Sequence, residues 1–167
     1  MRWDKAAEKL MTMDDAVWQR HANPWSVWTR VAITPFLFLA VWSYVWIGWW
    51  ALVPCAVVAL FTWLNPRIFP VPKSTNNWAS KGVMGERVFI NRKTVPIPRH
   101  HAVAAQVLTA LSVIFLIAAI YGFVVADFWA AFLGFHAAIV CKIWFVDRMA
   151  WLFEDMKDHE AYEGWLR

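Results

Sequence analysis

Apolar residues are concentrated in two long blocks, residues 31–64 and 102–146, and polar or charged residues precede, separate and follow them. A membrane-spanning helix needs about 17–25 predominantly apolar residues. Each block is too long for one such helix, and each has a break near its middle. The pattern therefore predicts four spanning helices in two hairpins, because backbone inside lipid satisfies its hydrogen bonds by forming helices.

Both breaks carry residues that suit a turn at a membrane surface. In the first block, Gly48 lies among three tryptophans, and tryptophan is enriched where the membrane meets water. In the second block, Gly122 and Asp127 interrupt the apolar run between aromatic residues. Asp127 is also placed to cap the helix that follows.

The distribution of Lys and Arg residues predicts how the chain is oriented in the membrane. All 16 Lys and Arg residues lie outside the two breaks, with five in residues 1–30, seven in residues 65–100 and four after residue 140. Cytoplasmic loops are enriched in these residues. Four spans place all three cationic segments on one side, whereas a single span over residues 31–64 would place the connector with seven cations outside. We therefore expect an inner-membrane protein with both termini in the cytoplasm.

The predicted fold is an all-α membrane protein with five parts: a cytoplasmic amphipathic segment (1–24), a transmembrane hairpin (25–64), a cytoplasmic connector (65–100), a second transmembrane hairpin (101–146) and a cytoplasmic helical tail (147–167). The amphipathic segment rests on a helical stripe of Trp3, Ala6, Leu10, Met13 and Val17, with a helix ending near His21. In the connector, residues 86–90 and 94–98 flank Asn91-Arg92-Lys93, which predicts a short β-hairpin. The tail is expected to continue the fourth span as one helix.

Composition agrees with a membrane protein, because 60% of the 167 residues are hydrophobic and the mean hydropathy is +0.42. About thirty mostly polar residues precede the first apolar run, unlike a secretory signal, so we expect that run to be retained. The net charge of +4 is explained by positive loops and does not indicate nucleic acid. Cys55 and Cys141 are expected near opposite membrane faces, too far apart for a disulfide.

Polar residues next to the membrane boundary define one candidate site on the cytoplasmic face. A basic set with a nearby carboxylate suits a phosphate or carboxylate group. The proposed ligand-binding residues are His21, Asn23, Arg30, Asn65, Arg67, Glu86, Arg87, Asp147, Arg148 and Glu154. Simpler roles remain open for many of them: helix capping by Asn23 or Ser26, solvated charges after the fourth span, and cations that only fix topology.

Histidines offer a further candidate chemistry. His100 and His101 adjoin the third span, and together with His21, His159 and nearby carboxylates they could ligate a metal. The chain contains no HxxxH, HExxH or CxxC pattern, so we assign neither a metal nor a cofactor. His136 lies within the fourth span, where an ionisable group suggests function. A hydrogen bond across helices, to Ser43, Thr62, Thr109 or Ser112, is the simpler expectation.

The core His-Ala-Asn-Pro-x-Ser-x-Trp-Thr-Arg within residues 18–30 resembles a signature of a small prokaryotic family of four-helix membrane proteins of unknown function. Residues 65–67, 144–149 and 154–156 resemble that family too. The resemblance implies no activity, but it suggests that these cytoplasmic-face residues belong to one site.

Two classes of function fit these observations. The first is a binding or accessory protein that holds an anionic lipid-like ligand or docks a larger membrane complex or a second copy of itself. The alternative is a membrane enzyme acting on a lipid-like substrate, with His21, His100 or His101 and Asp147 or Glu154 as acid–base groups or metal ligands. A transporter has little support because the spans carry few polar groups.

Overall fold

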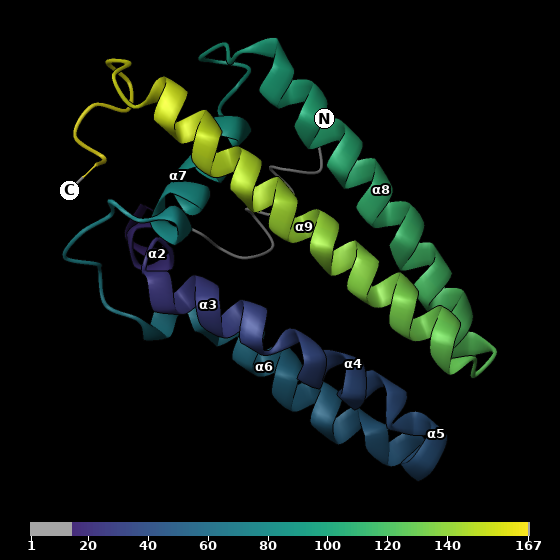
Figure 1. Cartoon of the computed structure of the whole chain (residues 1–167). Coiled ribbons are helices and arrows are strands. Elements are labelled where there is room, and N and C mark those ends of the chain that lie inside the picture. The colour runs from purple at the N-terminus through teal and green to yellow at the C-terminus, as the bar shows by residue number, and fades with distance from the viewer. Residues whose placement is uncertain (1–14, 167) are drawn as a thin grey trace.

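The computed structural model describes residues 15–166, and every regular element within them is a helix (Figure 1). The elements are α2 (Asp15–His21), α3 (Pro24–Ala32), α4 (Thr34–Trp42), α5 (Tyr44–Ile47), the 3-10 turn η1 (Gly48–Ala51), α6 (Leu52–Ile68), α7 (Trp78–Ile90), α8 (Arg99–Val124) and α9 (Phe128–Met156).

The first apolar block folds into a helical hairpin. Helices α3, α4 and α5 follow one another, and α6 returns beside α4 (Figure 1). The reversal occurs at Gly48, whose φ of 54° and ψ of −131° suit glycine because it has no Cβ. The predicted turn at Gly48 is therefore confirmed.

The second apolar block forms the long antiparallel pair of α8 and α9. The Asp127 side chain accepts a hydrogen bond from the Ala130 backbone N–H at 3.0 Å, which confirms the predicted cap of α9. Helix α9 continues without a break to Met156, so the fourth apolar segment and the first ten residues of the predicted tail form one helix, as predicted, whereas the described residues after Met156 are not helical. Cys55 and Cys141 are free, as predicted.

Three helical stretches are long and apolar enough to cross a membrane: Pro24–Ile68, Arg99–Val124 and Phe128–Met156. The first of these covers 45 residues and contains the reversal at Gly48. Length and composition thus support a membrane protein, and the first stretch differs from the other two in being folded back on itself.

The predicted β-hairpin in the connector is wrong, because none of the described residues forms a strand and residues 78–90 form helix α7. Asn77 caps this helix by accepting a hydrogen bond from the Ser80 N–H at 2.9 Å. Helix α7 then packs directly on α9: a Cβ added at Gly85 would lie 1.7 Å from the Met149 carbonyl oxygen. Short apolar runs do not reveal such a partner, which is why the local pattern was misleading.

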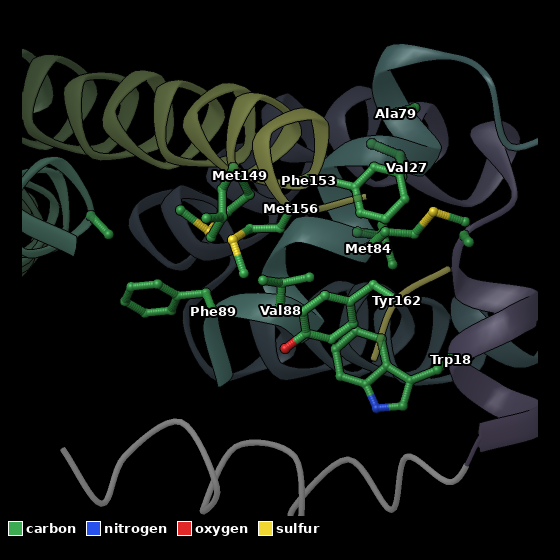
Figure 2. Close-up of a cluster of buried hydrophobic side chains, with 14 residues drawn as sticks. Trp18, Val27, Ala79, Met84, Val88, Phe89, Met149, Phe153, Met156 and Tyr162 are labelled. Atoms are coloured by element: carbon green, nitrogen blue, oxygen red, sulfur yellow. The ribbon is translucent and has the colours of Figure 1, made fainter. Parts of the chain in front are cut away.

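The main core lies where α7 meets α9 and receives side chains from both ends of the described chain. Figure 2 shows Trp18 and Tyr162 on one side of this cluster and Met149 and Phe153 of α9 on the other. A second, smaller cluster joins α4 to the α8–α9 pair and contains Phe38, Trp42, Ala119, Ala131 and Phe135.

The predicted amphipathic stripe lies mostly outside the described residues, since Trp3, Ala6, Leu10 and Met13 precede residue 15. Its last member, Val17, lies on α2. That helix ends at His21, as predicted.

Candidate functional site

The start of α3 is fixed by Asn23. Its side-chain oxygen accepts a hydrogen bond from the Trp25 N–H at 2.9 Å, and Pro24 occupies the first turn. These are the usual roles of Asn and Pro at a helix start. The Asn23 amide also donates to the Pro70 carbonyl oxygen at 2.9 Å. Asn23 therefore ties the segment after α6 to the start of α3.

Behind this cap, a directed chain of hydrogen bonds joins α2, α3 and α6. The Ser26 hydroxyl donates to the Asn65 side-chain oxygen at 2.7 Å, and the Asn65 amide donates to the Thr29 hydroxyl at 2.8 Å. The Ser26 oxygen lies 3.4 Å from His21 Nδ1, which is placed to donate to it. His21, Ser26 and Asn65 are all buried. Because buried polar groups are costly unless paired, this network holds α6 against α3.

The pKa of His21 is lowered to about 3, chiefly by burial and also by the nearby cations Arg30 and Lys142, against the opposing effect of Glu86. His21 is therefore neutral at physiological pH. A neutral imidazole suits its role as a donor to Ser26 and adds no charge to its surroundings.

A pocket of about 210 Å³ lies beside this network, between α3, the start of α4, α7 and α9. Three charged side chains reach it from three helices: Arg30 from α3, Glu86 from α7 and Lys142 from α9. The rest of the lining is apolar apart from one hydroxyl, and consists of Val27, Val31, Thr34, Val83, Ile139, Ile143 and Val146.

The positive and negative charges in the pocket do not cancel. Lys142 Nζ lies 2.7 Å from Glu86 Oε1 and forms an ion pair with it. Burial alone would raise the pKa of the Glu86 carboxyl, but Lys142 and Arg30 outweigh it and the pKa is lowered. Glu86 is thus ionised, and the two cations with one carboxylate leave a charge of +1.

Arg30 supplies the uncompensated charge. Its Nε donates to the Ser26 carbonyl oxygen at 3.2 Å, which directs the guanidinium from the buried network toward the pocket. Among the described residues, no other hydrogen bond or ion pair of Arg30 is formed. Its two Nη groups can therefore bind a carboxylate or phosphate in the two-pronged geometry that guanidinium favours.

The other proposed site residues lie in different surroundings. Arg67 packs over Trp63 at 4.3 Å and Arg87 over Trp165 at 4.7 Å. On the seam between α7 and α9, Asp147 accepts a hydrogen bond from Trp78 Nε1 at 2.8 Å. Farther along the same seam, Glu154 pairs with Lys81 and Lys157.

These contacts place the proposed ligand-binding residues in several separate groups. His21, Asn23 and Asn65 support the start of α3, while Arg30 and Glu86 face the pocket. The Arg67 and Arg87 guanidiniums stack on aromatic rings, Asp147 and Glu154 join α7 to α9, and Arg148 lies beside His101, with Nη2 3.4 Å from His101 Nδ1.

Sequence reasoning missed Lys142 as a site residue. In the sequence it is one cation near the end of the fourth span, and its place four residues before the end of the apolar block carries no further signal. The prediction for His136 is wrong: its Nδ1 lies 2.8 Å from the Phe132 carbonyl oxygen on its own helix, and its ring packs against Phe38.

With this geometry in place, comparison with known proteins adds one result. The sequence matches the model of DUF6653, a family of unknown function, over residues 3–167. The chain belongs to this family. No curated protein and no solved structure matches it. Family membership therefore brings no activity to these residues, and the function must be argued from the pocket.

Proposed function

We propose that this DUF6653 protein binds an anionic amphiphile in the pocket between its two helical hairpins, at the cytoplasmic boundary of the inner membrane. The ligand would place a phosphate or carboxylate group against Arg30 and Lys142 and its hydrocarbon against the apolar lining. The observation that carries this proposal is the meeting of two cations and a mostly apolar wall in one pocket.

The membrane arrangement proposed here has four spans. The stretch Pro24–Ile68 has 45 residues, more than twice the roughly 20 that cross a bilayer, and it doubles back at Gly48. Reading it as two spans puts Gly48 and Asp127 on one side and all the cationic segments on the other. The positive-inside rule then assigns the pocket and both termini to the cytoplasmic side.

The chemistry of the pocket favours an anion with a hydrocarbon tail over a small polar anion. Arg30 and Lys142 lie on helices that belong to apolar stretches, and they share the pocket with valine and isoleucine side chains. A small polar ligand would leave that apolar surface in contact with water or lipid. An amphiphile satisfies both parts of the lining, as ligand pockets usually combine apolar walls with a few placed polar groups.

Lipid binding to the full chain in detergent can be measured by native mass spectrometry, with phosphatidic acid and a fatty acid as anionic probes and phosphatidylcholine as the zwitterionic probe. We expect the anionic probes to bind more tightly. Arg30→Gln or Lys142→Gln should weaken that binding about 10- to 100-fold, since a hydrogen bond to a charged group contributes about 1.5–3 kcal/mol.

Lys93→Gln provides the matched control, because it removes one exposed cation from the turn after α7 and outside the pocket. Its affinity should equal that of the wild type. Equal losses in all three variants would mean that the lipids respond only to net charge, and unchanged binding in Arg30→Gln and Lys142→Gln would refute the pocket as the site. The relative affinities of phosphatidic acid and the fatty acid identify the headgroup chemistry.

A further inference from the structure

A second group of polar side chains, separate from the pocket, gathers where α8 begins and α9 nears its end. His100 and His101 are consecutive on α8, so their side chains leave the helix about 100° apart. Both rings nevertheless turn toward Asp155 of α9, with Nε2 of His101 2.8 Å and Nε2 of His100 3.8 Å from Asp155 Oδ2. The two ring centroids are 4.1 Å apart.

We propose that His100, His101 and Asp155 form a binding site for a divalent transition-metal ion of the Zn²⁺ type. One ligand atom from each residue lies within 4.8 Å of the others. Ligand atoms of a tetrahedral zinc site lie about 3.3 Å apart when the bonds are about 2.0–2.1 Å long, so small side-chain rotations close the site. Imidazole and carboxylate are ligands that Zn²⁺ accepts, and three protein ligands leave a fourth position for water.

The three proposed ligands differ in solvent exposure, and this difference suits an ion that exchanges with solvent. The His101 side chain is 1% exposed and therefore held in place, whereas those of His100 and Asp155 are 63% and 47% exposed. An ion can reach the site from solvent and meet one fixed and two adjustable ligands. None of the three residues lines the pocket between the hairpins, so this proposal is independent of amphiphile binding.

Arg148 gives the proposal a test that an incidental cluster would not pass. Its Nη2 lies 3.4 Å from His101 Nδ1, and its Nε is buried with no hydrogen-bond partner among the residues that the structure describes. In this arrangement Nδ1 accepts from Arg148, and Nε2 carries the proton donated to Asp155. When Nε2 binds the ion, that proton moves to Nδ1, which can then no longer accept. Arg148 therefore opposes metal binding through both its charge and its hydrogen bond.

The experiment uses the full chain purified in detergent with a histidine-free tag, stripped with EDTA and titrated with Zn²⁺ against a chromophoric chelator. We expect one ion per chain. His100→Ala, His101→Ala and Asp155→Asn should each weaken binding about tenfold or more, and Arg148→Gln should strengthen it by about tenfold, the size of effect produced by groups around metal ligands. Co²⁺ in the same site should give the visible absorption of a tetrahedral ion.

His159→Ala is the matched control, since it removes one exposed histidine from the turn after α9. Its affinity should equal that of the wild type. Asp155→Asn is nearly isosteric and exposed, so it tests the site even if loss of buried His101 disturbs folding. Wild-type affinity in Asp155→Asn or His100→Ala would overturn the proposal, as would an equal loss in His159→Ala or unchanged binding in Arg148→Gln.

Discussion

The two contact regions that join the hairpins are built in different ways. Near α7, the helices approach backbone to backbone at Gly85, the core mixes aromatic, methionine and valine side chains, and polar pairs such as Trp78–Asp147 border it. Deeper along α4, the contact consists chiefly of aromatic rings around Phe38. The pocket adjoins the first region, where α7 supplies Glu86 as the partner of Lys142, and the aromatic cluster holds the hairpins together farther along.

Of the substitutions that separate the two regions, one at Gly85 should lower the unfolding free energy most. Gly85→Val would place side-chain atoms where the Met149 carbonyl oxygen now lies, so α7 must separate from α9. We expect a loss of about 4 kcal/mol or more in unfolding free energy, the range reserved for severe core disruption. Thermal unfolding followed by size-exclusion chromatography measures it. Gly164→Ala, where a Cβ meets no atom within 4 Å but φ is +84°, should cost only about 1–2 kcal/mol.

Phe38→Ala should weaken the aromatic region and leave the α7 region intact. The Phe38 side chain is buried and contacts rings of α8 and α9, including Phe123 and Phe135. A Phe→Ala change in a packed core costs on the order of 3 kcal/mol. The same unfolding assay should show this loss, whereas Phe36→Ala, at an exposed position on α4, should show little. Equal effects of the two substitutions would contradict the proposed role of the cluster.

The buried His21 should make the stability of the protein depend on pH. Burial lowers the His21 pKa from 6.5 to about 3, so below pH 6.5 the unfolded chain takes up a proton that the folded chain does not. Stability is therefore full above pH 6.5 and falls as the pH drops toward 3. At pH 5 the loss is about 2 kcal/mol, from about 1.36 kcal/mol per pH unit. The difference in stability between pH 7.5 and pH 5 should shrink by about 2 kcal/mol in His21→Gln; an unchanged difference would exclude His21 as a cause.

The buried network beside the pocket should give the smallest of these effects. Ser26→Ala removes a hydrogen bond of 2.7 Å and leaves the Asn65 side-chain oxygen without its donor. We expect a cost of about 1–2 kcal/mol, typical of an unpaired buried acceptor. Ser43→Ala is the control, since the Ser43 hydroxyl donates to the Ala40 carbonyl oxygen of its own helical arm. Stability of Ser26→Ala equal to that of Ser43→Ala would show that the network is not a structural support.

Features governed by local chemistry could be predicted from the sequence. The turn at Gly48, the caps at Asn23 and Asp127 and the unbroken course of α9 follow from backbone preferences and hydrophobic patterning. Features set by distant partners could not. Residues 86–90, the end of helix α7, are predicted from the sequence as one strand of a β-hairpin, because the packing of this helix depends on Gly85 meeting Met149, which no local pattern records.

The candidate site could likewise be predicted only in part, because some of its residues meet only through distant contacts. Arg30 and Glu86 were expected among the site residues from their types and positions at the boundary. Lys142 was not, since its role depends on the helix pairing that brings it to 2.7 Å from Glu86. Similarly, His100 and His101 were noticed in the sequence, but Asp155, 54 positions after His101, was linked to them only by the fold.

The ion pair between Glu86 and Lys142 has a consequence for any ligand of the pocket. The carboxylate of Glu86 is an anion attached to the protein, so an incoming headgroup competes with it for Lys142. A neutral or zwitterionic headgroup gains too little to displace it. A phosphate monoester with two negative charges can engage Arg30 and share Lys142. If the pocket binds the proposed amphiphile, Glu86 would therefore act as an internal competitor for Lys142 and would favour headgroups that carry more negative charge.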